Sequence, residues 1–262
     1  MTKIPAPLFA EDELPRYARH IALREIGGPG QARLKRARVL VVGAGGLGSP
    51  VLMYLAAAGV GRLTIVDDDL VSRSNLQRQV VHAEDRVGLA KVDSARIGLA
   101  GLNPYVAVEP VPQRLDAGSA ARLVTGHDLV IDACDNLETR HVLNAACTAQ
   151  GVPLLSGAIS QWEGQVTLYD PARGAPCFAC LFPVIPAPGL APDCAEAGVM
   201  GALPGILGAI MAAEAIKEIA GAGRGLRGRL HIHDALWGES REIAVRRDAH
   251  CPVCGPVHGE TG

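Results

Sequence analysis

The sequence is poor in aromatic residues, has no excess of one charge and contains no long apolar run. Aromatic residues make up only 3% of the 262 residues, so the core must be aliphatic, and an apolar fraction of 48% provides enough material for it. The 25 basic and 27 acidic residues nearly cancel, which argues against broad nucleic-acid binding because that function needs a basic face. The longest apolar run, Val199–Ala213, is too short to span a membrane and is interrupted by Pro204 and several glycines.

A secretory signal is also missing from the start of the sequence. Residues 1–11 contain one lysine and no apolar segment of the kind that a signal peptide needs. We therefore expect a cytoplasmic protein with neither nucleic acid nor a membrane among its partners. In a reducing compartment its seven cysteines are expected to be metal ligands or reactive thiols rather than disulfide partners.

Strands and helices are predicted to alternate up to residue 160. Strands are expected at 39–42, 63–66, 106–111, 128–132 and 152–156, and helices at 47–58, 89–100 and 137–150. This alternation is typical of a doubly wound, mostly parallel α/β sheet of the Rossmann-like class. Residues 11–34, before the first strand, are predicted to form helices and a loop.

The pattern changes after residue 160. Apolar and polar residues alternate at 164–169, and antiparallel strands there and at 229–233 and 242–245 are expected to extend the sheet. A proline-rich crossover loop is predicted at 182–193, followed by a long buried helix over 199–220. No domain boundary is visible. We expect one domain over 1–262, made of N-terminal helices (11–34), a nucleotide-binding half (38–160) and a second half (161–262).

A glycine-rich loop, Gly43–Gly48, lies between the first predicted strand and the following helix. In such a strand–loop–helix unit Gly43 is expected to allow the tight turn. Gly45 is expected to let the backbone approach phosphates, and Gly48 to let the helix pack on the strand. Gly46 belongs to the same loop. The helix then presents free N–H groups and the positive end of its dipole to the phosphates.

Acidic and cationic residues follow where the ribose and phosphates of a nucleotide would lie. Asp67 ends the second predicted strand, and a carboxylate there can accept hydrogen bonds from ribose hydroxyls. Asn75, Arg78 and Lys91 supply polar and cationic groups, which suit a polyphosphate better than a nicotinamide. The segment therefore points to ATP. Asp68 and Asp69 come next, and either could cap the turn that follows; for Asp69 this is the favoured interpretation.

Two further acids, Asp132 and Asp135, stand at the carboxyl end of the fourth predicted strand. In an open α/β sheet this edge faces the ligand, so Asp135 is a candidate for holding Mg²⁺ against the phosphates. Asp135 is also a candidate N-cap of the helix predicted from residue 137, and the two roles are compatible.

The cysteines form two C-x-x-C pairs, Cys177 with Cys180 and Cys251 with Cys254. Four thiolates are the set that Zn²⁺ prefers in structural sites, which would attach the C-terminal tail to the main fold. Two separate redox dithiols are the alternative. Cys194, at the end of the proline-rich loop, is interpreted either as a low-pKa nucleophile or as a small buried residue.

These motifs together resemble those of the MoeB/ThiF-type (HesA/MoeB/ThiF) adenylyltransferases, bacterial relatives of the ubiquitin-activating enzymes. The resemblance covers nearly the whole chain. Its segments are Arg16–Arg19, Gly43–Gly48, Ser74–Gln79, Gly88 with Lys91, Cys134–Asn136, both C-x-x-C pairs and Cys194–Val199.

The resemblance implies ATP-dependent adenylation of the C-terminal Gly-Gly carboxylate of a ubiquitin-like sulfur-carrier protein. The adenylated carrier would then receive sulfur as a thiocarboxylate, in a molybdopterin, thiamine or related pathway. Residues 161–262 would bind the carrier. By the same resemblance, Asp67 would hold the ribose and Asp135 would hold Mg²⁺. The phosphates would be held by Asn75, Arg78 and Lys91.

The resemblance also implies partners. Arg19 matches an arginine that reaches into the site of a partner subunit, so a homodimer is expected. Cys194 is expected to matter only in sulfur transfer, since adenylation needs no thiol. No rhodanese-like domain follows Gly262 in this sequence, so an external sulfur donor, a cysteine desulfurase or a rhodanese, is expected.

Three alternatives remain open at this point. An NAD-dependent oxidoreductase explains the glycines and Asp67 but leaves the cationic residues and the cysteine pairs without roles. A non-catalytic, zinc-stapled scaffold leaves Arg78 and Lys91 unexplained. A ThiF-type enzyme that adenylates a peptide or a tRNA keeps the chemistry and changes the acceptor.

Overall fold

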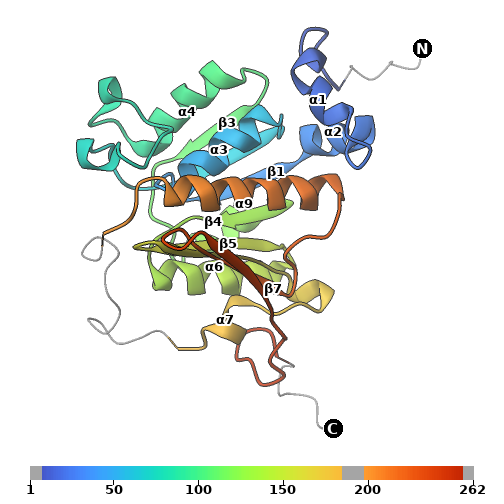
Figure 1. The fold of residues 1–262 in the computed structure, drawn as a ribbon, viewed down its shortest axis with the longest axis vertical. Helices are drawn as coiled ribbons and strands as arrows, with labels where there is room; N and C mark the ends of the chain where they lie inside the picture. Colours follow the sequence, from blue (N-terminus) through green and yellow to red (C-terminus); the bar gives the residue numbers. More distant parts are fainter. Residues whose placement is uncertain (1–7, 185–197, 256–262) are drawn as a thin grey trace.

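The computed structural model describes residues 8–184 and 198–255, and its centre is an eight-stranded sheet with helices on both faces (Figure 1). The strands lie in the order β3-β2-β1-β4-β5-β6-β7-β8. Their bounds are β1 (Arg38–Val42), β2 (Arg62–Val66), β3 (Ala107–Val111), β4 (Leu129–Asp132), β5 (Leu154–Ser160), β6 (Glu163–Tyr169), β7 (Arg229–Asp234) and β8 (Glu239–Ala244).

The first five strands are parallel, as predicted, and the strand order reverses between β1 and β4. Val42, the last residue of β1, is paired with Val66 on one side and with Asp132 on the other. The carboxyl ends of these three strands therefore meet at one edge. A reversal of strand order at that edge is where open α/β sheets bind their ligands.

Strands β6, β7 and β8 extend the sheet in antiparallel pairs, which confirms the predicted change of pattern. The hairpin between β5 and β6 pairs Leu154 with Tyr169 and Ser160 with Glu163. The end of β6 thus lies beside the start of β5, at the edge opposite the reversal point.

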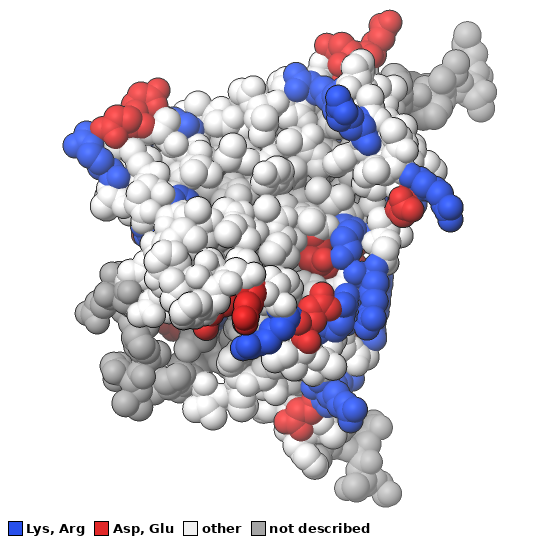
Figure 2. All heavy atoms as spheres, in the orientation of Figure 1, with Lys and Arg blue, Asp and Glu red and all other residues white. Residues whose placement is uncertain are grey.

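Helices cover the two faces of the sheet. Their bounds are α1 (Ala18–Ile21), α2 (Gly27–Arg36), α3 (Gly48–Ala57), α4 (Lys91–Leu102), α5 (Ala120–Val124), α6 (Leu137–Gln150), α7 (Phe178–Leu181) and α9 (Leu203–Ala220), with short 3-10 helices η1 (Leu14–Tyr17), η2 (Arg73–Asn75), η3 (Glu84–Arg86) and η4 (Pro171–Arg173). One aliphatic core lies between the sheet and α2, α3, α4 and α9, and a second lies between the sheet and α5, α6 and α7. The face over α3 and α9 is largely uncharged across its middle (Figure 2).

Some predicted elements differ from the observed ones. Helix α9 begins at Leu203 rather than Val199, because the preceding residues pair with a hairpin instead: Val199 bridges Gln161, and the Met200 N–H donates to the Gln161 carbonyl. Helices α5 and α7 were not predicted. With five and four residues they are too short for the helical period to show.

The longest helix, α9, has 18 residues and carries charged side chains, among them Glu214 and Lys217. Within 8–184 and 198–255, no helix has both the length and the apolar character that crossing a membrane requires.

We predict opposite effects for two glycine-to-alanine changes. A Cβ on Gly61, between α3 and β2, would lie 1.8 Å from the Lys35 carbonyl oxygen, whereas a Cβ on Gly101 in α4 would meet nothing within 4 Å. Gly61→Ala should lower the free energy of unfolding by about 1–3 kcal/mol through overpacking. Gly101 lies in the last turn of α4, and Gly101→Ala should raise it by about 0.4–1 kcal/mol because alanine reduces the conformational entropy of the unfolded chain. Urea denaturation of both variants measures this, and equal effects would contradict the close approach at Gly61.

Candidate functional site

The glycine loop follows β1 and lies directly against the end of β4. Gly43 has φ of 98°, and a Cβ there would be 2.6 Å from the Ala133 carbonyl oxygen. A Cβ on Gly48 would be 1.9 Å from the Gly43 carbonyl oxygen. The tight turn and the close helix packing expected of these two glycines are therefore present. At Gly45 a Cβ would meet only the Gln79 side-chain amide, at 3.5 Å.

Asp67 lies beside this loop at the end of β2. Its Oδ2 accepts a hydrogen bond from the Ala44 N–H at 2.7 Å, and its Oδ1 accepts one from the Asp69 N–H at 2.9 Å. Burial raises the pKa of Asp67, while the Lys91 charge and the two N–H groups oppose that rise. A carboxylate has about four acceptor positions, so Asp67 keeps capacity for ribose hydroxyls while it holds the loop.

Lys91, the first residue of α4, is buried and forms an ion pair with Asp69, whose Oδ2 is 2.6 Å from Nζ. The interpretation of Asp69 as a turn cap is wrong: Ser72 is the N-cap residue of the following 3-10 helix η2, and the Asp69 carboxylate faces Lys91 instead. One carboxylate oxygen from each of Asp67, Asp68 and Asp69 lies within 4.8 Å of the other two. Asp69 therefore holds the lysine close to Asp67, which in turn bonds the glycine loop.

Arg78 and Asn75 come from the segment between β2 and α4. The Arg78 Cγ is 3.7 Å from the position of a Cβ on Gly46, so the stem of this side chain lies along the loop. Within the described residues the Arg78 guanidinium has no hydrogen-bond or ion-pair partner. The Asn75 Oδ1 accepts from Gln79 Nε2 at 3.0 Å. Gln79 is buried against the loop, although we did not select it as a site residue from the sequence.

The two acids at the end of β4 have different surroundings. Asp132 is fully buried and accepts hydrogen bonds from the Ser156 hydroxyl at 2.6 Å and the Cys134 thiol at 2.7 Å; its carboxylate is also 3.6 Å from Arg140. Asp135 is exposed and has no side-chain partner in the part of the chain that the structure describes. Asp132 is therefore structural, whereas the Asp135 carboxylate is free to bind a ligand.

The N-cap role expected for Asp135 is wrong. The N-cap of α6 is Asn136, whose side-chain oxygen accepts a hydrogen bond from the Thr139 N–H at 2.9 Å. An amide side chain at the next position satisfies the helix end, so Asp135 is not needed there.

Two predicted site residues remain, Arg19 and Cys194. Arg19 is in α1, is exposed and has no side-chain partner among the described residues. Cys194 falls within 185–197, outside the described residues, so its two interpretations stay predictions.

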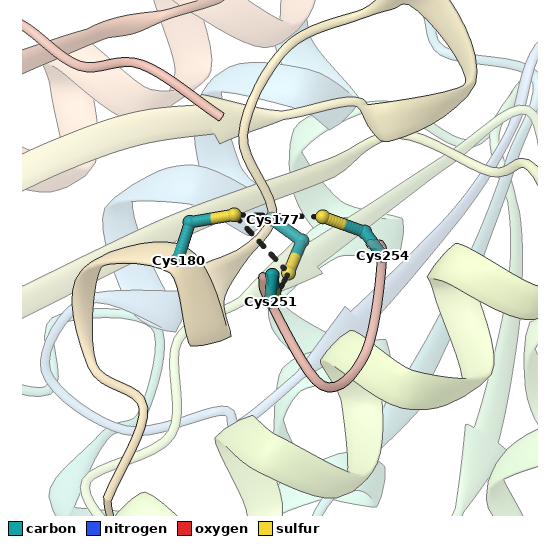
Figure 3. Close-up of side chains that lie close together, drawn as sticks. All are labelled: Cys177, Cys180, Cys251 and Cys254. Atoms are coloured by element: carbon teal, nitrogen blue, oxygen red, sulfur yellow. Dashed lines mark hydrogen bonds between the residues drawn. The ribbon is translucent and has the colours of Figure 1, made fainter. Parts of the chain in front are cut away.

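The four cysteines of the C-x-x-C pairs meet in one cluster (Figure 3). The Sγ atoms of Cys177 and Cys251 are 3.5 Å apart, those of Cys180 and Cys254 are 3.4 Å apart, and those of Cys177 and Cys180 are 3.9 Å apart. Tetrahedral Zn–S bonds of about 2.3 Å place sulfur atoms about 3.8 Å apart. The closest sulfur atoms belong to different pairs, which favours one four-ligand site over two separate dithiols.

Backbone groups support the cysteine cluster. The Asp248 N–H donates to Cys180 Sγ at 3.4 Å. Such a hydrogen bond stabilises the negative charge of a metal-bound thiolate. Gly255 closes a tight turn after the second pair: its N–H donates to the Cys251 carbonyl at 2.9 Å, and a Cβ would lie 2.5 Å from that oxygen. The donor set therefore fits Zn²⁺.

The glycine loop and the polar and charged residues around it lie at the carboxyl edge of the sheet, where they can bind a nucleotide. The glycine loop and the first turn of α3 offer backbone N–H groups, and Arg78 and Lys91 offer positive charge. Such groups stabilise the negative charge that develops on phosphates during transfer.

Comparison with known proteins agrees with this geometry. The model of the ThiF family matches residues 17–253. The SAMP-activating enzyme E1 of Haloferax volcanii is 51% identical over 93% of this chain and 89% of its own length. The sulfur carrier protein adenylyltransferase of Thermus thermophilus is 49% identical over 94% and 93%, and the molybdopterin-synthase adenylyltransferase of Escherichia coli is 46% identical over 94% and 98%.

Solved structures share the fold at lower identity. The crystal structure of Escherichia coli MccB with MccA-N7isoASN has a TM-score of 0.81 at 22% identity and covers 96% of this chain and 77% of that one. The family model and the relatives both extend over nearly the whole sequence, which confirms the resemblance drawn from the motifs: the chain belongs to the ThiF family.

Proposed function

We propose that this chain uses ATP to adenylate the C-terminal Gly-Gly carboxylate of a ubiquitin-like sulfur-carrier protein. The observation that carries the proposal is the grouping at the sheet edge, where the glycine loop, Arg78, Lys91 and the free Asp135 lie around the point of strand reversal. The relatives named for sulfur carriers and molybdopterin synthase support this substrate class.

Each group would have a distinct task. The phosphates of ATP would lie against the glycine loop and the first turn of α3, near Lys91 and Arg78, and the ribose would lie at Asp67. Residues 38–160 would thus hold the nucleotide, and residues 161–262 would hold the carrier. Asn75 would complete the polar contacts to the phosphates.

Asp135 is the residue that fits a magnesium ion. Its carboxylate is exposed, lies at the ligand edge and is not engaged by other described residues. Carboxylates of this kind bind Mg²⁺ together with substrate phosphates. When bound, the ion would neutralise part of the phosphate charge.

The reaction requires the protein mainly to position the two reactants and to stabilise negative charge. An oxygen of the carrier carboxylate attacks the α-phosphorus of ATP, the bond from that phosphorus to the bridging oxygen breaks, and pyrophosphate leaves. Because the attacking group is already ionised at neutral pH, no general base is needed. The site has to align the two reactants and to stabilise the negative charge of the leaving pyrophosphate. Arg78 and Lys91 would supply the positive charge for the second task.

The later sulfur step would replace AMP on the carrier and give a thiocarboxylate. We propose that the sulfur comes from a separate donor, a cysteine desulfurase or a rhodanese, and that Cys194 takes part only here.

A homodimer is part of the proposal. Arg19 is exposed and unpaired among the described residues, as expected of a side chain that reaches into a partner's site. The face over α3 and α9 is largely uncharged (Figure 2), and Tyr54 of α3 and Ile206 of α9 are 55% and 37% exposed. An exposed apolar face of this kind suits a contact between copies of the chain.

The first prediction concerns the carrier. ATP–pyrophosphate exchange should occur when a sulfur carrier ending in Gly-Gly is present and should be absent without it, because the carboxylate is the attacking group. A carrier that lacks the terminal glycines is the matched control. Mg·ATP, and not NAD, should protect the chain from thermal unfolding. Exchange without a carrier, or with a peptide or tRNA in its place, would contradict this substrate.

A second prediction concerns the magnesium site. Asp135→Asn should lower the exchange rate by about a hundredfold or more, because charge stabilisation at the phosphates is lost. The thermal unfolding curve should stay close to that of the wild type, since Asp135 has no partner among the described residues.

Subunit mixing provides the control for this variant. Arg19→Ala and Asp135→Asn dimers should each be inactive, and exchange of subunits between them should restore part of the activity, because one site of each mixed dimer then has both residues. Restoration shows that Asp135→Asn folds and dimerises. Near-normal exchange by Asp135→Asn alone would refute its role.

The third prediction concerns the cysteine cluster, which we propose holds a structural Zn²⁺. Purified protein should contain one zinc ion per chain, and a strong chelator should lower the melting temperature, because metal-binding energy is folding energy. Cys254→Ser should lose zinc and stability, whereas the control Cys134→Ser should retain zinc, since Cys134 bonds Asp132 and does not belong to the cluster. Full zinc content in Cys254→Ser would rule this site out.

A further inference from the structure

Ala44, the second residue of the glycine loop, is held through both of its backbone polar groups. Its N–H donates to Asp67 Oδ2 at 2.7 Å, and its carbonyl oxygen is 2.9 Å from His82 Nε2. A carbonyl oxygen only accepts, so the proton of the His82 ring is on Nε2 and the ring donates to the loop. Two side chains from different segments thus fix one residue of the phosphate loop.

The other ring nitrogen of His82 contacts the helix that carries Lys91. His82 Nδ1 is 2.9 Å from the Ser94 hydroxyl, and Ser94 lies in the first turn of α4, three residues after Lys91. Because Nε2 carries the proton, Nδ1 accepts from the Ser94 hydroxyl. His82 therefore connects the loop on one side to the lysine-bearing helix on the other.

The surroundings keep this ring neutral and fixed. His82 is 7% exposed and Ser94 is completely buried. Burial lowers the pKa of His82, and the charges of Lys91 and Arg86 lower it further against the opposing effect of the Ala44 carbonyl. In the neutral ring with the proton on Nε2, both ring nitrogens are hydrogen-bonded, one as a donor and one as an acceptor.

We propose that His82 is a positioning residue for ATP: by bonding Ala44 and Ser94 together, it sets the spacing between the phosphate loop and Lys91. The inference rests on the proposed function and deepens it. The ring itself is buried behind the loop, so it would act on the nucleotide through the loop carbonyl and the helix.

Two conservative variants separate the two bonds. The amide nitrogen of His82→Gln occupies the place of Nε2 and keeps a donor for Ala44, whereas the side chain of His82→Asn ends at the place of Nδ1 and reaches only Ser94. His127→Gln is the matched control. His127 is half-buried and also bonds a hydroxyl, that of Thr64 at 3.0 Å, but it precedes β4 at the opposite edge of the sheet.

The experiment measures Mg·ATP binding by isothermal titration calorimetry in the absence of a carrier. It is followed by the Michaelis constants for ATP and for the carrier in pyrophosphate exchange. His82→Asn should weaken ATP binding about tenfold, the loss of one buried hydrogen bond, and should raise the Michaelis constant for ATP while leaving that for the carrier unchanged. His82→Gln should restore ATP binding to within about threefold of wild type. His127→Gln should bind ATP as the wild type does.

The outcomes are distinguishable. If His82→Asn melts at a lower temperature yet binds ATP like the wild type, His82 is only a core residue and the inference is wrong. Equal loss of ATP binding in the Gln and Asn variants would also refute it, because the bond to Ala44 would then not matter. If the wild-type protein itself does not bind Mg·ATP, the proposed function fails first, independently of His82.

Discussion

The nucleotide edge of this protein depends on a contact between two stretches of backbone. The loop after β1 passes so close to the end of β4 that no Cβ fits on Gly43, and Gly48 of α3 lies so close to the Gly43 carbonyl that no Cβ fits there either. This closeness lets α3 start directly beyond β1 and directs its first turn to the edge where Asp135 stands. The Gly43 N–H donates to the Val66 carbonyl at 2.9 Å, whereas both backbone polar groups of Ala44 are held by side chains, those of Asp67 and His82.

Some charged groups at this edge are paired with other side chains and stabilise the fold, whereas others have no partner among the described residues. Asp132 and Arg140 are buried together and hydrogen-bonded within the end of β4 and the start of β5, and an unpaired charge there would be costly. Lys91 is paired with Asp69, which holds it in place. Asp135 and Arg78 have no partner among the described residues. Opposite charges left free on one edge are what a magnesium-bound polyphosphate requires.

Sequence patterns predicted the features that repeat over several residues. The strand–loop–helix unit, the bounds of α6 and the four-cysteine set follow from apolar periodicity, glycine spacing and paired motifs. The sequence did not show which of several neighbouring side chains makes a given contact. Asn136 rather than Asp135 caps α6, and Asp69 pairs with Lys91 across 22 positions, because tertiary geometry decides which of several suitable groups meets its partner. His82 gave no sequence signal, since neither of its partners, a backbone carbonyl and a serine, is distinctive.

The position of the cysteine cluster is consistent with the structural role proposed for it. Strand β6 runs antiparallel to β5, so its end at Tyr169 lies beside Leu154, at the amino edge of the parallel strands. The chain then leads to Phe178, whose ring packs against Tyr169 at 5.8 Å, and to the cysteines on either side of it. The glycine loop and Asp135 lie at the opposite, carboxyl edge. The cluster is also joined to α6, because Asn144 accepts a hydrogen bond from the Phe178 N–H at 2.8 Å and its Nδ2 is 3.6 Å from Cys177 Sγ. A metal held by these thiolates would therefore affect adenylation through the fold of the second half and its packing on α6.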